Sequence, residues 1–375
     1  MEADFNPFLL SGYKGAAYFC DRENESTQLI RNIRNDVKTT LIAIRRMGKT
    51  GLIRHVFDQV EREQIGRCLY VDILPTQTQQ ELTEVLAGAI LRTFPQQSSL
   101  GTRFMEFIKG FNPLLSFDPL TGQPEFGFSF QEQKQKEQSL KALFEFLDSL
   151  DVKIVMAIDE FQQILSYPER NTEALLRTIT QPLKNINFIF SGSNQHLLSM
   201  IFNQANRPFF SSTQFLSLLA IEVDAYTAFI ARHFNKAGRS ISDEAVAFVL
   251  DWTRRHTYYT QVVCNRLFGY PSVTLDIAKE ECARLIKEQE LVYYQYRNLL
   301  TGPQWNLLAA IAKEGNVYHP TGGSFIADHK LGTAATVKRS LEALIQKEMI
   351  YRNADGSGQY YQVYDCFLSR WLEMY

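Results

Sequence analysis

The chain has 375 residues, which corresponds to two or three domains at about 150 residues per domain. Hydrophobic residues make up 45% of the chain and charged residues 21%, as in a globular protein with a full core. Lys and Arg number 39 and Asp and Glu number 41, so the formal net charge is −2. This balance excludes a protein that binds nucleic acid or acidic lipid mainly through its overall charge.

Targeting and metal-binding patterns are missing from the sequence. The first residues, Met1–Phe5, include no basic segment followed by an apolar stretch, and no apolar run approaches the roughly 18 residues of a membrane helix. We therefore expect no signal peptide, no membrane partner and a cytoplasmic location. The six histidines lack ligand spacing, so we expect no zinc site. The scattered cysteines form no CxxC pair, which favours buried, reduced thiols at Cys20, Cys68, Cys264, Cys282 and Cys366.

Residues 1–210 alternate short β-branched runs with longer helical patterns. This alternation predicts an α/β fold with a parallel sheet and crossover helices. The expected strands are Thr39–Ile44, Cys68–Ile73, Ile154–Ile158, Ile186–Ser191 and Gln214–Leu218. The expected helices are Gly51–Gln64, Gln79–Thr93, Glu132–Asp148 and Asn171–Pro182. One segment breaks the alternation, because Phe111–Phe130 has two alternating apolar runs around a Pro/Gly turn and predicts a β-hairpin insertion.

The chain changes character after this region. Residues 220–290 are helical throughout in pattern, with no strand expected. Residues 301–375 then predict a winged helix-turn-helix, with helices at Pro303–Lys313, Ser324–Lys330 and Thr333–Lys347 and a wing over Met349–Val363. We therefore expect three domains: a core over 1–218, a helical lid over 219–295 and a winged helix over 296–375.

A phosphate-binding loop follows the first expected strand. Such a loop needs backbone N–H groups and a helix N-terminus directed at the phosphate. In residues 43–50 of this chain, we expect Lys49 to contact the phosphates and the Thr50 hydroxyl to bind Mg²⁺. The usual pattern begins with Gly, whereas this loop begins with Ala43, and a Cβ disfavours positive φ. The expected nucleotide-binding residues are Ala43, Arg45, Arg46, Met47, Gly48, Lys49, Thr50 and Gly51. Arg45 and Arg46 either neutralise phosphate charge or remain solvated on the outside of the loop.

Two carboxylates end a later apolar strand. Asp159 lies where a buried strand can hold Mg²⁺, and Glu160 lies where a base can activate water. The expected catalytic residues are thus Glu160, Asp159 and Lys49, with Thr50 and Asp159 as Mg²⁺ ligands. The alternative is an acidic pair that caps the following helix.

Two weaker candidates accompany this site. Ser193 and Asn194 follow another apolar strand and either sense the γ-phosphate or form a turn and helix cap. Arg207 is either an arginine finger, acting within the chain or on a second copy, or a structural arginine.

These residues together resemble the archaeal-type ATPase family of the STAND P-loop NTPases, relatives of the AAA+ origin-recognition ATPases. The resemblance spans nearly the whole chain and is specific because Arg45–Thr50 (RRMGKT) combines with Asp159–Gln162 (DEFQ). Further similar segments are Asn6–Phe8 and Phe19–Glu25, which match a motif near the adenine, and Ser191–Asn194, which matches the sensor strand. Arg255–Gln261 is similar to a Gly-His-Pro-Tyr-Tyr stretch of the lid, with Arg255 and Thr257 at the Gly and Pro positions.

The resemblance implies an AAA+-like core, an adenine nucleotide (ATP or ADP) and a nucleotide-gated switch. Our leading hypothesis is a slow or partner-stimulated Mg²⁺-dependent ATPase with an unidentified protein partner. The alternative is an ATP-regulated DNA-binding protein that uses Thr336, Lys338 and Arg339 of the winged helix. Residues 301–375 hold seven Lys or Arg and seven Asp or Glu, a net of 7 − 7 = 0, which argues against DNA. A third hypothesis is an interaction scaffold with an inactive nucleotide site.

Overall fold

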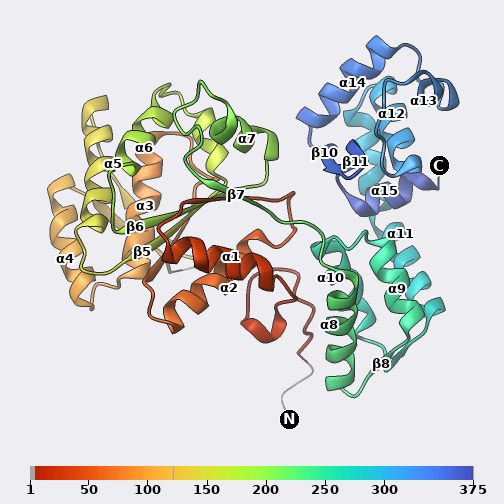
Figure 1. The fold of residues 1–375 in the computed structure, drawn as a ribbon, viewed down its shortest axis with the longest axis horizontal. Helices are drawn as coiled ribbons and strands as arrows, with labels where there is room; N and C mark the ends of the chain where they lie inside the picture. The colour runs from red at the N-terminus through yellow and green to blue at the C-terminus, as the bar shows by residue number, and fades with distance from the viewer. Residues whose placement is uncertain (1–4, 121, 375) are drawn as a thin grey trace. The chain divides into compact units, whose positions relative to one another are not determined.

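The computed structural model describes residues 5–120 and 122–374. The chain divides into two compact units, one from Ser11 to Ile221 and one that joins residues 5–10 to residues 222–374 (Figure 1). Residues Met1–Asp4, on which the signal-peptide expectation partly depends, lie outside the described residues. Within the described residues, none of the helices combines the length and apolar character needed to cross a bilayer.

The first unit contains a five-stranded sheet of order β2-β5-β6-β1-β7. All neighbouring strands are parallel, which confirms the predicted α/β fold. The strands are β1 (Thr39–Ile42), β2 (Arg67–Asp72), β5 (Ile154–Asp159), β6 (Ile186–Gly192) and β7 (Gln214–Ser217). β1, β5 and β6 are buried along their whole length, as expected for strands covered on both faces.

Helices cover both faces of this sheet. Figure 1 shows α1 and α2 on one face and α5, α6 and α7 on the other. A large apolar cluster joins the second set of helices to β2, β5 and β6. The helices are α1 (Glu23–Arg34), α2 (Lys49–Arg62), α3 (Gln79–Thr93), α4 (Ser99–Ile108), α5 (Gln133–Asp148), α6 (Thr172–Thr180) and α7 (Gln195–Asn203), with the 3-10 helix η3 (Phe161–Ser166).

The predicted hairpin is confirmed. β3 (Leu114–Phe117) pairs antiparallel with β4 (Pro124–Gly127), and Phe126 is buried against Phe104 of α4. Phe117 on β3 remains 61% exposed, so the aromatic residues of the insertion divide between the core and the surface. Helix α4 itself was absent from our expectations, although Ser98 forms a regular N-cap by accepting a hydrogen bond from Gly101.

The second unit begins with a helical part. Its helices are α8 (Val223–Lys236), α9 (Asp243–Trp252), α10 (Thr257–Leu267) and α11 (Leu275–Leu299). The expectation of no strand here is wrong in one detail, because β8 (Ser240–Ile241) and β9 (Ser272–Val273) form a short parallel pair. Two residues are too few for a periodic signal, and the pair forms because folding brings two loops side by side.

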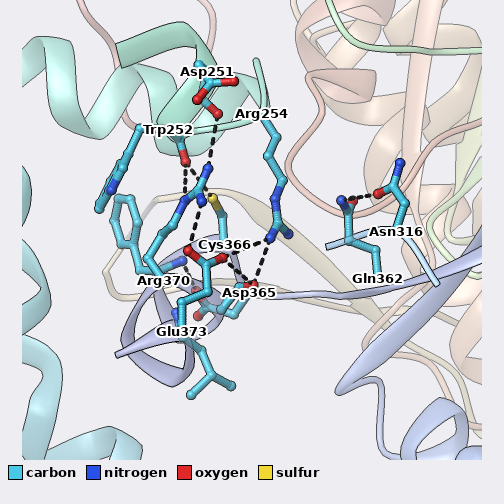
Figure 2. Close-up of polar contacts among 12 residues, drawn as sticks. Asp251, Trp252, Arg254, Asn316, Gln362, Asp365, Cys366, Arg370 and Glu373 are labelled. Carbon is cyan, nitrogen blue, oxygen red and sulfur yellow. Dashed lines mark hydrogen bonds and ion pairs between the residues drawn. The ribbon is translucent and has the colours of Figure 1, made fainter. Parts of the chain in front are cut away.

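The rest of this unit is a winged helix. It consists of α12 (Gly302–Glu314), α13 (Gly323–Asp328), α14 (Ala334–Gln346), the antiparallel wing β10 (Ile350–Asp355) and β11 (Gly358–Val363), and α15 (Cys366–Glu373). α15 also contacts the turn after α9 (Figure 2). Arg370 donates to the carbonyl oxygen of Trp252 at 2.8 Å, and Arg254 donates to Ser369 Oγ at 2.8 Å.

Candidate functional site

The loop after β1 has the backbone of an anion-binding turn. Arg46 and Gly48 adopt positive φ of 63° and 95°, and α2 begins at the next residue, Lys49. Gly48 permits this conformation without a Cβ clash, and the helix N-terminus directs its partial positive charge into the loop. Ala43 does not adopt positive φ, so replacing the usual Gly causes no strain here.

Lys49 lies between two carboxylates. Its Nζ is 3.3 Å from Glu160 Oε1 and 3.6 Å from Asp159 Oδ1, and only 9% of the side chain is exposed. β1 and β5 are separated by β6 in the sheet, but their carboxyl ends lie at the same edge because the strands are parallel. This shared edge brings together residues more than 100 positions apart.

Asp159 accepts hydrogen bonds at both carboxylate oxygens. Oδ2 accepts from Tyr70 at 2.5 Å and from Thr50 Oγ1 at 3.3 Å, while Oδ1 accepts from Ser191 Oγ at 2.6 Å. Burial by itself would raise the pKa of Asp159, but the charge of Lys49 and these hydrogen bonds outweigh burial and lower it. Asp159 is therefore held as a carboxylate, the form that binds a divalent cation.

Glu160 is the N-cap of η3 and has a positive φ of 55°. Its Oε2 accepts hydrogen bonds from Gln162 Nε2 at 2.5 Å and from Ser193, through Oγ at 2.9 Å and the backbone N–H at 3.1 Å. Burial opposes ionisation of Glu160, but Lys49 and these donors outweigh it and lower its pKa. Positive φ at a non-glycine residue is uncommon and concentrates at functional sites.

The two sensor candidates occupy different places. Ser193 contacts Glu160, and its Oγ also accepts from Arg45 Nε at 3.4 Å, so Arg45 belongs to the same network. The side chain of Asn194 instead caps α7 by accepting a hydrogen bond from Leu197 N at 3.1 Å. Ser191, which we did not select as a site residue, is the group at the end of β6 that contacts Asp159.

The other expected residues lie at the edge of this site or away from it. Met47 is buried in the loop. Gly51 packs near the Phe19 ring, and a Cβ added at Gly51 would lie 3.5 Å from that ring, in ordinary van der Waals contact. Arg207 forms an ion pair with Glu173 of α6 at 2.6 Å. In this conformation Arg207 is therefore engaged within its own unit.

Two residues at the end of β2 belong to the site and were missed. Tyr70 contacts Asp159, and Arg54 of α2 lies over the Tyr70 ring, 4.3 Å from its centre. Asp72 is the register partner of Asp159, and burial is the main cause of its raised pKa. The expected strand did end near an acidic residue, but only the order β2-β5 shows that it lies beside Asp159.

Two of the segments that carry the resemblance, residues 6–8 and 255–261, lie in the second unit, whereas Phe19–Glu25 lies in the first. Arg255 has a positive φ of 55°, and Thr257 is the first residue of α10. These are backbone conformations that favour Gly at the first position and Pro at the second, although this chain has Arg255 and Thr257 there. Asn6 donates its side-chain N–H to the carbonyl oxygen of Asn265 at 2.7 Å and thereby joins residues 5–10 to α10.

Comparisons with known proteins agree with this architecture. Residues 33–201 match the model of an AAA domain, and residues 291–374 match that of a probable winged helix domain. The chain combines a P-loop ATPase core with a C-terminal winged helix. No curated protein sequence is significantly similar to this chain.

Solved structures extend the likeness to the whole chain. The Walker-type ATPase PABY2304 of Pyrococcus abyssi is 19% identical, with a TM-score of 0.66 over 98% of this chain and 99% of that one. The ORC2 protein of Aeropyrum pernix, solved with ADPNP and ADP, is 15% identical, with a TM-score of 0.59 over 99% of this chain and 96% of that one. The ORC1 protein of Aeropyrum pernix, solved in complex with DNA, is 12% identical, with a TM-score of 0.50 over 95% of this chain and 93% of that one. At these identities the likeness concerns the fold.

Proposed function

We propose that this protein binds ATP and hydrolyses it slowly in the presence of Mg²⁺, as a nucleotide-gated switch of the archaeal-type STAND ATPases. The observation that carries the proposal is the position of Lys49 Nζ, 3.3 Å from Glu160 and 3.6 Å from Asp159. A phosphate-binding cation, a candidate base and a candidate metal ligand thus lie in direct contact beside the phosphate loop.

The residues of the site fit a magnesium nucleotide. Thr50 and Asp159 supply a hydroxyl and a carboxylate oxygen 3.3 Å apart, the donor chemistry that Mg²⁺ prefers. Within residues 5–120 and 122–374 no group of three or more His, Cys, Asp or Glu could hold a metal ion. The pair of Thr50 and Asp159 suits Mg²⁺, because this ion binds proteins through one or two carboxylates and takes its other ligands from phosphates and water. When bound, Mg²⁺ would neutralise part of the charge on the phosphates.

In this proposal each residue of the site has a defined role. The loop amides and Lys49 bind the phosphates, and Thr50 and Asp159 hold the metal. Glu160 accepts a proton from the attacking water at a carboxylate oxygen. Lys49 cannot contact phosphate and hold both carboxylates equally well, so nucleotide binding would rearrange these ion pairs. This exchange of partners is the local event that a switch requires.

Phosphate release from Mg²⁺–ATP by the purified full chain tests the proposal, with Glu160→Gln as the paired variant. We expect slow turnover by the parent and a loss of at least about 100-fold in the variant, while ATP binding is retained, because the amide has the shape of the carboxylate but cannot take the proton. Turnover that is equal in both proteins would show that Glu160 is not the base. Absence of both binding and turnover in the parent would contradict the function itself.

The winged helix supports a second candidate, an ATP-regulated DNA-binding protein. Lys338 and Arg339 are exposed on α14, where a recognition helix would meet a groove. The equal number of acidic and basic residues in this domain argues for a protein contact instead.

A further inference from the structure

We propose that Gln162, seated against Gly192, is a positioning residue that clamps one carboxylate oxygen of Glu160 and so determines which oxygen acts as the base. The inference deepens the proposed function and depends on Glu160 serving as that base. The evidence is the hydrogen bonding of Glu160 by Gln162 and Ser193, where η3 begins and β6 has just ended, together with Gly192, whose backbone conformation does not require a glycine.

The clamp acts on Oε2 of Glu160. This oxygen accepts three hydrogen bonds, from Gln162 Nε2 at 2.5 Å, Ser193 Oγ at 2.9 Å and Ser193 N at 3.1 Å. A carboxylate oxygen has about two lone-pair sites, so Oε2 is saturated. The other oxygen, Oε1, contacts Lys49 Nζ at 3.3 Å.

Gly192 explains how Gln162 reaches this position. A Cβ built at Gly192 would lie 2.0 Å from Gln162 Oε1, far inside van der Waals contact, and 2.9 Å from the end of the Leu198 side chain. Gly192 lies in β6 and is not among the glycines with positive φ, so an L-residue could adopt its backbone conformation. A side chain at residue 192 would therefore displace the amide end of Gln162, because the two would occupy the same space.

The side chain of Gln162 leaves one buried polar atom unpaired, which indicates that the amide is present for a function. Its Oε1 is buried and has no hydrogen-bond partner among the described residues. An unpaired buried polar atom destabilises the folded state, and an apolar side chain at the same place would avoid that loss. An apolar side chain could not make the hydrogen bond that Gln162 Nε2 donates to Glu160.

The chemical consequence follows from the position of Lys49. When phosphate draws Lys49 away, Oε1 loses its partner while Oε2 stays held by Gln162 and Ser193. Oε1 then takes the proton from water, the water oxygen bonds to the γ-phosphorus, and the bond from that phosphorus to the bridging oxygen breaks to release ADP. Without the clamp the carboxylate can rotate, and the basic oxygen is no longer fixed toward the phosphate side.

Two variants on different elements test the clamp. We expect Gln162→Ala and Gly192→Ala each to lower kcat for ATP about 10-fold and to leave KM within about twofold, because the clamp orients the base and does not touch ATP. Gln163→Ala is the matched control, since Gln163 is the next residue of η3 and donates to the carbonyl oxygen of Thr76 at 2.8 Å, away from Glu160. This control should retain the parent kcat.

The double variant separates positioning from a general structural effect. If the Cβ at residue 192 acts by displacing Gln162, then Gly192→Ala combined with Gln162→Ala should lose no more activity than Gln162→Ala alone. Losses that multiply, or a kcat equal to the parent in Gln162→Ala, would overturn the inference. In either case turnover by the parent would leave the proposed function standing.

A readout independent of hydrolysis completes the test. The Ser193 amide donates to the clamped oxygen, so its hydrogen exchange in the nucleotide-free protein should accelerate several-fold in Gln162→Ala and Gly192→Ala, and not in Gln163→Ala. Faster exchange with no ATP turnover by the parent would support the clamp and contradict the proposed function. Unchanged exchange in both variants would contradict the clamp whatever the parent hydrolyses.

Discussion

Tyr70 donates a 2.5 Å hydrogen bond to Asp159 across 89 residues of sequence. The two residues lie on adjacent strands, and the ring of Tyr70 is covered by Arg54 of the helix that begins at Lys49. The β2 strand thus supports the acidic residue that the site needs, although no motif in the sequence identifies Tyr70.

Tyr70→Phe should destabilise the first unit. The change removes one donor from a buried carboxylate and leaves the ring in place, so we expect the free energy of unfolding to fall by about 1.5–3 kcal/mol, the usual range for a hydrogen bond to a charged group. Urea denaturation followed by fluorescence or circular dichroism measures the change. A midpoint equal to that of the parent would mean that Thr50 and Ser191 satisfy Asp159 without Tyr70.

Lys49→Ala should abolish tight binding of Mg²⁺–ATP. The loop would lose its phosphate-contacting cation while two carboxylates remain beside the phosphates, so we expect an affinity at least about 100-fold weaker by calorimetry. Lys38→Ala is a suitable control, because Lys38 lies just before β1 and donates to the carbonyl oxygen of Thr180. Parent-like affinity in Lys49→Ala would remove the loop from the nucleotide site.

The site should also contribute a pH-dependent term to stability. The pKa values of Asp159 and Glu160 lie below their ordinary values of 3.8 and 4.5, so their stabilisation is present above those ordinary values and is lost as the pH falls through the lowered ones. Lys49→Ala removes the charge that lowers both pKa values. We therefore expect the stability difference between parent and Lys49→Ala to be large at pH 7 and to shrink below about pH 4. A difference that grows on acidification would contradict this origin.

Arg207→Ala distinguishes the two roles considered for this arginine. In the structure Arg207 pairs with Glu173, whose pKa burial raises above its ordinary value. We expect the variant to lose stability because the buried carboxylate loses its partner, and to keep its turnover rate within about twofold of the parent. Turnover reduced by at least about 100-fold, with unchanged stability, would instead establish an arginine finger.

The winged helix should bind duplex DNA weakly. Its acidic and basic residues balance, so we expect no mobility shift of a random duplex near 150 mM salt, with or without ATP. Lys338→Ala with Arg339→Ala is the informative variant, because both side chains are exposed on α14. A sequence-selective shift that this double variant abolishes would favour the DNA-binding alternative.

Much of the fold was accessible from local patterns. The five strands, the hairpin at 111–130 and the helices of the winged helix follow the periodicity of their own residues, and the structure has them within a few positions. The short pair β8-β9 and the helices α4, α7 and α15 were not foreseen. A two-residue pairing has no period, and α4 has only 10 residues, a length at which a helical pattern is hard to tell from other short apolar runs.

The sequence by itself determined the phosphate loop and the acidic strand end, because each depends on neighbouring residues: Gly48 before Lys49 and Thr50, and Asp159 before Glu160. Only the tertiary structure decided which groups surround them. The parallel strand order brings Tyr70, Asp72 and Ser191 to one edge, where they meet Asp159. Contacts between strands far apart in the chain depend on how the sheet assembles, and no local period or motif encodes that order.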